Sequence, residues 1–145
     1  ASKLLQQAAD YGITKQQLLI APSNPQDIAE KIADINAGLL FFTQGIAKLG
    51  SAPTRMGEFL ACGIPVIGNR GVGDMAVLIE RYEVGVVLED GSDVAIAKAI
   101  EAMRVLLTDN ELAARCRHAA EDYFSADSGA EKYQKIYKNV IGVNH

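Results

Sequence analysis

The stretch that decides the fold reads Gly50-Ser-Ala-Pro-Thr-Arg-Met-Gly-Glu-Phe-Leu-Ala-Cys-Gly-Ile-Pro-Val-Ile-Gly-Asn-Arg-Gly-Val-Gly-Asp74. It predicts a loop, a short helix, a buried strand and a second glycine-rich loop. Pro53 suits the first helical turn, because its missing N–H would have no helical partner there. Gly63 suits the residue just past a helix, where φ is positive, and Pro65 prevents the helix from continuing.

The helix predicted over 53–62 has two chemically different faces. On a wheel of about 100° per residue, one face carries the apolar side chains of Met56, Phe59 and Leu60. The other face gathers hydroxyls, a cation and a carboxylate, namely Ser51, Thr54, Arg55 and Glu58. We therefore expect one face to pack on a core and the other to meet a ligand that carries phosphate and sugar hydroxyls.

Strands and helices alternate on both sides of this stretch, and the chain finishes in helices alone. The predicted strands are 17–21, 37–43, 65–68 and 84–88. The predicted helices are 2–11, 25–35 capped by Asn24, 53–62, 74–82, a long helix through 107 capped by Ser92 or Asp93, 109–124 and 128–141. The strands are continuous apolar runs, which indicates cover on both faces. We predict an α/β fold, a three-layer Rossmann-like doubly wound parallel sheet with extra C-terminal helices.

The last helices carry several aromatic residues. We interpret them as anchors that pack the last helix back on the domain: Tyr123, Phe124, Tyr133 and Tyr137. The lysines of that helix are interpreted as its solvated face: Lys132, Lys135 and Lys138.

Length and charge bound the class of protein. The 145 residues suffice for one domain, and the net charge of −4 argues against a general nucleic-acid or anionic-membrane surface, although it leaves room for a local basic pocket. We expect Cys62 and Cys116 to be reduced. The sequence shows no signal peptide and no run of 18 apolar residues, so we expect no membrane span and a soluble, cytoplasmic chain.

Three loops that follow strands, at 22–24, 44–52 and 69–73, are expected to converge at one edge of the sheet. Two helices begin there, near Pro53 and Asp74, and the free N–H groups of a helix start attract phosphate. The simpler interpretation of Asp74 is an N-cap.

Each candidate residue has a specific chemistry and a plain alternative. Arg55 could pair with a diphosphate, but a lone arginine is usually a solvated cation. Ser51 and Thr54 could donate to its oxygens, but both are common helix-start residues. Glu58 could accept bonds from vicinal sugar hydroxyls, but it is also an ordinary helix carboxylate.

Gly71 and Gly73 would let the backbone approach a ligand closely, although glycines after strands more often form tight turns. No cysteine, histidine and carboxylate spacing predicts a metal site. His118 lies in a charged helix beside Arg115 and Arg117 and fits a surface position. The sequence contains no nucleophile elbow and no Walker lysine loop, so catalytic residues stay unassigned.

Residues 58–67 and the following Gly71-Val-Gly-Asp74 resemble a known pattern. It is the Glu-Ala-Met-Ala-Cys-Gly-x-Pro-Val-Ile … Gly-Gly-x-x-Glu region of group 1 (family 4-like) GT-B glycosyltransferases. Residues 51–55 look like the Pro-Thr/Ser-Lys/Arg variant of that family, and the looser resemblance extends over nearly the whole chain.

The resemblance implies a C-terminal domain that binds a nucleotide-diphosphate sugar. Glu58 would bind the ribose hydroxyls, the helix start at 51–55 would face the diphosphate and sugar, and Pro22 and Ser23 would lie near the base. The family transfers a sugar, here expected to be a hexose, usually with retention and without a bound metal or other cofactor. The acceptor would be a sugar or lipid-linked glycan, and no nucleic acid is expected.

Two departures from the family pattern matter. The family's first glutamate precedes the second by eight residues, and that position here is Gly50. The chain also begins after the family's first strand, whose loop bears an arginine and a lysine. The resemblance therefore implies that residues 1–145 are an N-terminally truncated donor-binding domain. Without the acceptor domain it would be inactive alone, and the full-length enzyme would be cytoplasmic or peripheral to the inner membrane.

Two other interpretations stay open. One is a non-catalytic Rossmann-like nucleotide-binding or interaction module, in which Arg55 and Glu58 merely pair on the surface. The other is a sugar-nucleotide epimerase of GT-B architecture, for which no acid or base residues are apparent.

Overall fold

The computed structural model describes residues 2–43, 45–51 and 53–142. The chain divides into two compact units, residues 1–31 and 32–145, and each is described by itself.

The first unit contains α1 (Ser2–Asp10), the 3₁₀ helix η1 (Pro25–Asp27) and most of α2 (Ile28–Ile32). Gly12, which has a φ of +75°, follows the end of α1. The predicted helix over 25–35 ends early, at Ile32. Asn24 holds the N-cap position, but its side chain caps no backbone N–H and instead donates to Asp27 at 3.2 Å.

The prediction of a strand over 17–21 is wrong, because these residues form no strand in the structure. A strand is held by the backbone hydrogen bonds of a neighbour, and apolar composition does not supply that neighbour. Within this unit Leu19 is 91% exposed, so the apolar run has neither a paired backbone nor a covered face.

The second unit holds the sheet. Its elements are β1 (Gly38–Leu40), α3 (Ile46–Leu49), α4 (Thr54–Ala61), β2 (Val66–Asn69), α5 (Met75–Tyr82), β3 (Gly85–Leu88), α6 (Asp93–Leu106), α7 (Leu112–Phe124) and α8 (Ala126–Ile141). The three strands are parallel and adjacent in the order β1-β2-β3, with Val66 opposite both Gly38 and Gly85. The four-residue helix α3 lies in a segment for which the sequence predicts a loop.

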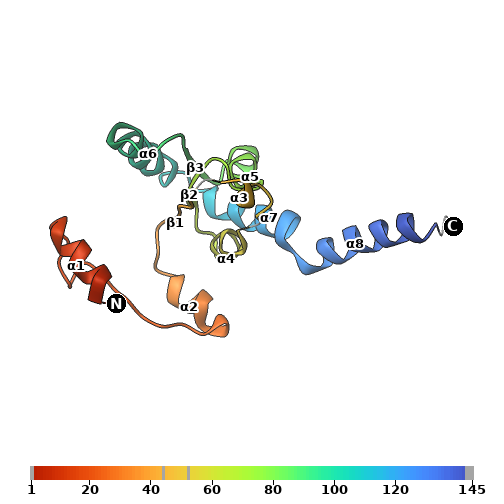
Figure 1. The fold of residues 1–145 in the computed structure, drawn as a ribbon, viewed down its shortest axis with the longest axis horizontal. Coiled ribbons are helices and arrows are strands. Elements are labelled where there is room, and N and C mark those ends of the chain that lie inside the picture. The colour runs from red at the N-terminus through yellow and green to blue at the C-terminus, as the bar shows by residue number, and fades with distance from the viewer. Residues whose placement is uncertain (1, 44, 52, 143–145) are drawn as a thin grey trace. The chain divides into compact units, whose positions relative to one another are not determined.

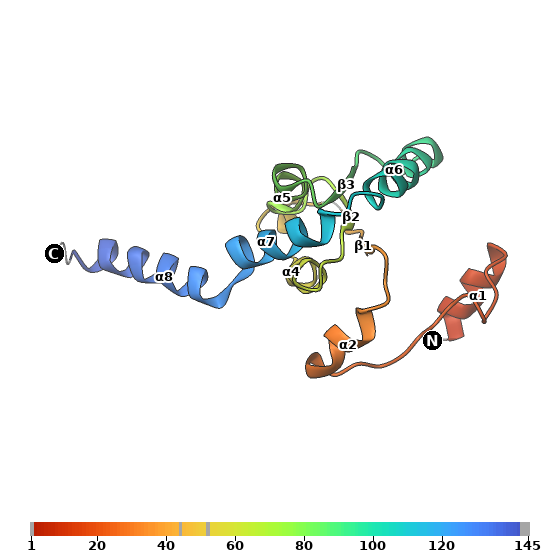
Figure 2. The ribbon, with the colours of Figure 1, turned by 180° about the vertical axis from the view of Figure 1, so that it is seen from behind.

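Helices cover both faces of this sheet, as Figures 1 and 2 show from opposite sides. On one face, α4, α5 and α7 enclose a core that includes Met56, Leu60 and Cys116, all fully buried. On the other face, Ala99 and Met103 of α6 pack on the sheet. The predicted α/β architecture with a parallel sheet and extra C-terminal helices is confirmed.

Helix boundaries follow their caps. The Ser92 hydroxyl accepts from Ala95 N–H at 3.2 Å and begins α6, as predicted. The Ser125 hydroxyl accepts from Ser128 N–H at 3.2 Å, so α8 begins at Ala126, two residues before its predicted start.

Two of the four predicted aromatic anchors are wrong. Tyr123 and Phe124 pack against the core, but Tyr133 and Tyr137 are 64% and 61% exposed. The reason lies at Ser125, whose extended backbone (φ −66°, ψ 142°) ends α7 and lets α8 leave in a new direction. In both ribbon views α8 runs away from the strands (Figures 1 and 2).

Candidate functional site

The loops after β1 and β2 touch each other at the carboxyl edge of the sheet, as their positions predict. The Lys48 carbonyl accepts from the backbone N–H groups of Ser51, at 3.1 Å, and of Gly73, at 2.9 Å. Gly73 has φ +43°, and a Cβ there would lie 2.0 Å from the Ser51 carbonyl oxygen. The contact therefore requires glycine at this position.

Beside this contact lies a small cavity of about 130 Å³. Gly50, Ser51, Gly73 and Asp74 line it together with Tyr123 of α7. The Tyr123 hydroxyl donates to the Asp74 carboxylate at 2.7 Å, which raises the pKa of Tyr123. Asp74 stands at the N-cap position of α5 as predicted, but its side chain caps no backbone N–H. The carboxylate holds α7 instead.

A second, larger hollow of about 540 Å³ lies between α4 and α7. Thr54 and Glu58, one helical turn apart, line it from α4, and Arg117 and Glu121 line it from α7. Arg55 is exposed and does not line this hollow. The structure thus brings Thr54 and Glu58 to the same hollow and leaves Arg55 outside its lining.

The polar face of α4 carries little internal bonding. The interaction-module interpretation assumes that Arg55 and Glu58 pair with each other. In the part of the chain that the structure describes, these two side chains form no ion pair with each other. The Glu58 carboxylate accepts no hydrogen bond there either. It stays available to a ligand.

The glycine-rich loop after β2 is a tight turn. Gly71 and Gly73 both have positive φ, +82° and +43°. The Gly73 N–H is already bonded to the Lys48 carbonyl, so it does not offer a free donor to a phosphate. Gly71 is exposed, so of these two glycines it is the one whose backbone a ligand could approach closely.

Sequence reasoning missed two residues at the end of β2. The Asn69 side chain accepts from Phe42 N–H at 2.8 Å and donates to the carbonyls of Phe42 and Arg70, at 3.1 and 3.0 Å. It thereby ties the chain after β1 to the end of β2. An asparagine closing an apolar strand was the available signal.

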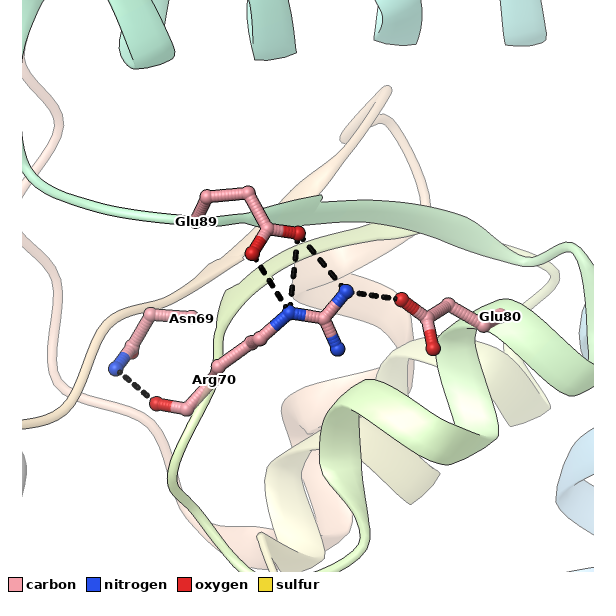
Figure 3. A network of polar contacts seen from close by, with 4 residues as sticks. All are labelled: Asn69, Arg70, Glu80 and Glu89. Carbon is pink, nitrogen blue, oxygen red and sulfur yellow. Dashed lines mark hydrogen bonds and ion pairs between the residues drawn. The ribbon is translucent and has the colours of Figure 1, made fainter.

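Arg70 forms an ionic cluster with two glutamates (Figure 3). Its Nε donates to both Glu89 carboxylate oxygens, at 2.8 and 3.0 Å, and its Nη2 contacts Glu80 at 2.5 Å. These bonds raise the pKa of Arg70 and lower the pKa of Glu89. The partners are 10 and 19 residues away, so only the strand order reveals the cluster.

A third hollow, of about 640 Å³, opens at the same edge of the sheet. Phe42 and Thr43 line it after β1, Asn69 lines it from β2, and Glu89 and Asp90 line it after β3. Its two acidic residues are not among the site residues that the sequence predicts.

Pro22 and Ser23 belong to the first unit and are defined only within it. The Pro22 carbonyl accepts from the Lys31 ammonium at 2.5 Å, and the Ser23 hydroxyl donates to the Asn24 carbonyl at 3.1 Å. Both are exposed.

The described residues contain no cluster of three histidines, cysteines or carboxylates that could hold a metal ion. His118 instead packs edge-on against Tyr82. None of the helices in the described ranges is long and apolar enough to cross a membrane.

Comparisons with known proteins place this geometry in context. The model of the family "Glycosyl transferases group 1" matches residues 2–123. Among solved structures, "Sucrose-phosphate synthase (tll1590) from Thermosynechococcus elongatus" is similar with a TM-score of 0.70 at 16% identity. The match covers 99% of this chain and 35% of that one, and at this identity it shows the fold alone. A comparison with curated proteins gave no match.

Proposed function

Because the chain belongs to the group 1 glycosyl transferase family, we propose that it is the donor-binding part of a hexosyltransferase. It would bind a nucleotide-diphosphate sugar, and the whole protein would pass the sugar to an acceptor sugar or lipid-linked glycan. The chain spans 35% of the length of the solved structure it matches, so the acceptor site is assigned to the rest of the protein. Its proposed location is the cytoplasm, where nucleotide sugars would reach it.

The observation that carries this proposal is the Glu58 carboxylate. It is exposed on α4, lines a hollow of about 540 Å³ and accepts no hydrogen bond within the described residues. Ligand sites typically enclose about 300–1,000 Å³, so a nucleoside fits this volume. A carboxylate can accept from two vicinal hydroxyls at once, and ribose offers such a pair.

The start of α4 supports the diphosphate half of the proposal. Pro53 holds the N-cap position and provides no side-chain cap, so the first turn keeps N–H groups and a partial positive charge for an anion. The exposed Arg55 adds a full positive charge in that turn. Groups of this kind stabilise the negative charge that develops on a diphosphate leaving group.

The remaining details of the reaction follow the family resemblance. We propose retention at the anomeric carbon and transfer without a bound metal. In this scheme Arg55 and the α4 N-terminus hold the diphosphate, while Glu58 fixes the ribose and so orients the sugar.

Isothermal titration of the full-length protein with UDP, GDP and ADP and their sugar conjugates tests the proposal. We expect one nucleotide series to bind, and Glu58→Gln to weaken it about tenfold or more, since a hydrogen bond to a charged group contributes about 1.5–3 kcal/mol. Glu101→Gln is the matched control, because Glu101 is also an exposed helical glutamate, on α6. No binding by any series, or equal affinity for the Glu58 and Glu101 variants, would contradict the assignment.

A further inference from the structure

The hollow between α4 and α7 contains two charged side chains besides Glu58. Arg117 and Glu121 line it from α7, one helical turn apart. Arginine and glutamate at this spacing often pair with each other on a helix. Here both are exposed, and within the described residues neither forms an ion pair or a hydrogen bond. Both charges therefore stay available to a ligand.

The two helices run in opposite directions along this hollow. A Cβ added at Gly57 would lie 2.9 Å from Cδ1 of Phe124, and one added at Gly63 would lie 2.5 Å from Nη1 of Arg117. The Arg117 guanidinium therefore lies at the C-terminal end of α4, in space that a side chain at Gly63 would fill. Because α4 is eight residues long, about 10 Å of helix separates this guanidinium from the first turn.

This order of side chains matches the order of groups in a nucleoside diphosphate. The proposed function places the diphosphate at the first turn of α4 and the ribose at Glu58, and the position of the base rests on that placement. The base and the diphosphate are attached to opposite sides of the ribose, so the base would continue towards the C-terminal end of α4. Arg117 lies at that end, and Glu121 lies between Arg117 and Phe124 along α7.

Guanine is the base whose hydrogen-bonding groups satisfy both side chains. Its O6 and N7 atoms accept side by side, and the fork of an arginine donates to both at once. Its N1–H and N2–H groups donate side by side, and the two oxygens of a carboxylate accept from both. Uracil has a carbonyl on each side of its single N–H, so a carboxylate would meet an acceptor. Adenine and cytosine each offer one amino group and would leave one carboxylate oxygen unpaired.

We propose that Arg117 and Glu121 recognise a guanine base, so that the nucleotide of the donor is GDP. Arg117 donates to O6 and N7, and Glu121 accepts from N1–H and N2–H. The 2-amino group lies on the edge of guanine nearer the ribose, and Glu121 lies on the ribose side of Arg117. One orientation of the base therefore satisfies both contacts.

Isothermal titration of the full-length protein with GDP, UDP, ADP, CDP and IDP tests the proposal. We expect GDP to bind most tightly and IDP, which lacks only the 2-amino group, to bind about tenfold more weakly. Glu121→Ala should weaken GDP binding at least tenfold and bring GDP and IDP within about twofold of each other. Arg117→Lys keeps the positive charge but loses the fork, so it should weaken GDP binding about tenfold. Both variants should keep the native circular dichroism spectrum, because the replaced side chains are exposed.

The matched controls are Glu101→Ala and Arg104→Lys, because both residues are exposed on α6. They should bind GDP like the parent protein. Glu58-dependent binding of UDP, ADP or CDP in preference to GDP would overturn the guanine assignment and leave the proposed function in place. Equal affinity of the parent for GDP and IDP, or Arg117 and Glu121 variants that bind GDP like the controls, would also overturn it. If no nucleotide binds, both the guanine assignment and the proposed function are wrong.

Discussion

Replacing Gly73 with alanine tests the contact between the loops that follow β1 and β2. The added Cβ would lie 2.0 Å from the Ser51 carbonyl oxygen and 3.1 Å from its carbon. Contact at van der Waals distance needs more than about 3 Å, so the two loops must separate by about 1 Å or more. Because the Gly73 N–H donates to the Lys48 carbonyl, the same movement stretches that hydrogen bond.

The expected loss in the free energy of unfolding combines four contributions. Alanine at a φ of +43° costs about 1 kcal/mol, and the lost hydrogen bond about 1 kcal/mol. Displacing packed backbone costs a further 1–3 kcal/mol or so. The smaller entropy of the unfolded alanine chain returns about 0.7 kcal/mol. The net destabilisation is about 3 kcal/mol, which corresponds to a Tm lower by roughly 10 °C for a chain of this size.

Urea unfolding followed by circular dichroism measures this loss. Gly50→Ala is the control, because Gly50 lines the same cavity and has φ −98°. Among the described residues, apart from its chain neighbours, a Cβ added there would meet no atom within 4 Å. Its free energy of unfolding should stay within about 0.5 kcal/mol of the parent chain. If Gly73→Ala and Gly50→Ala unfold at the same urea concentration, the loop contact is not as described.

Two further predictions concern ionisable groups. The Arg70 ion pair holds the pKa of Glu89 below its usual value, so the pair contributes stability above the unfolded pKa of about 4.3 and loses it as pH falls through the lower folded value. Arg70→Gln should therefore lower Tm at pH 7, and the difference from the parent should shrink towards pH 3; a difference that grows in acid would contradict this. Burial raises the pKa of the Cys116 thiol to about 11, whereas Cys62 is only half-buried. At pH 8 a thiol reagent should label Cys62 in the native protein and reach Cys116 only after unfolding. Mass spectrometry of the labelled peptides measures the order. Labelling of Cys116 before Cys62 would show that Cys116 is not buried.

Proline and glycine residues at the ends of elements made part of the fold predictable from the sequence. Pro53, Gly63 and Pro65 act through their own backbone restrictions, so α4 and β2 begin and end within one or two residues of the predicted positions. The strand over 17–21 failed because strand formation depends on a neighbour that its own sequence does not specify. The prediction that Tyr133 and Tyr137 are anchors failed for a similar reason, since both are exposed. Periodicity predicts an apolar stripe on a helix but does not say what covers it.

The same distinction applies to the candidate site. Thr54 and Glu58 line the same hollow because four residues make about one helical turn, a spacing that can be read from the sequence. The cluster of Arg70, Glu80 and Glu89 and the bond between Tyr123 and Asp74 join residues 10 to 49 positions apart. Those contacts arise from the parallel order of β2 and β3 and from the packing of α7, which sequence spacing does not encode.

The polar groups at the carboxyl edge divide into those that hold the loops and those that remain for a ligand. Asp74 is engaged by Tyr123, the Gly73 N–H by Lys48, and Arg70 by its two glutamates. These groups would have to break native contacts before they could bind a diphosphate. The polar face of α4 has no such commitment in the described structure. The proposed donor site therefore rests on α4, with Glu58 as its centre, and the glycine-rich loop holds the segment that leads into that helix, through the bond from Gly73 N–H to the Lys48 carbonyl.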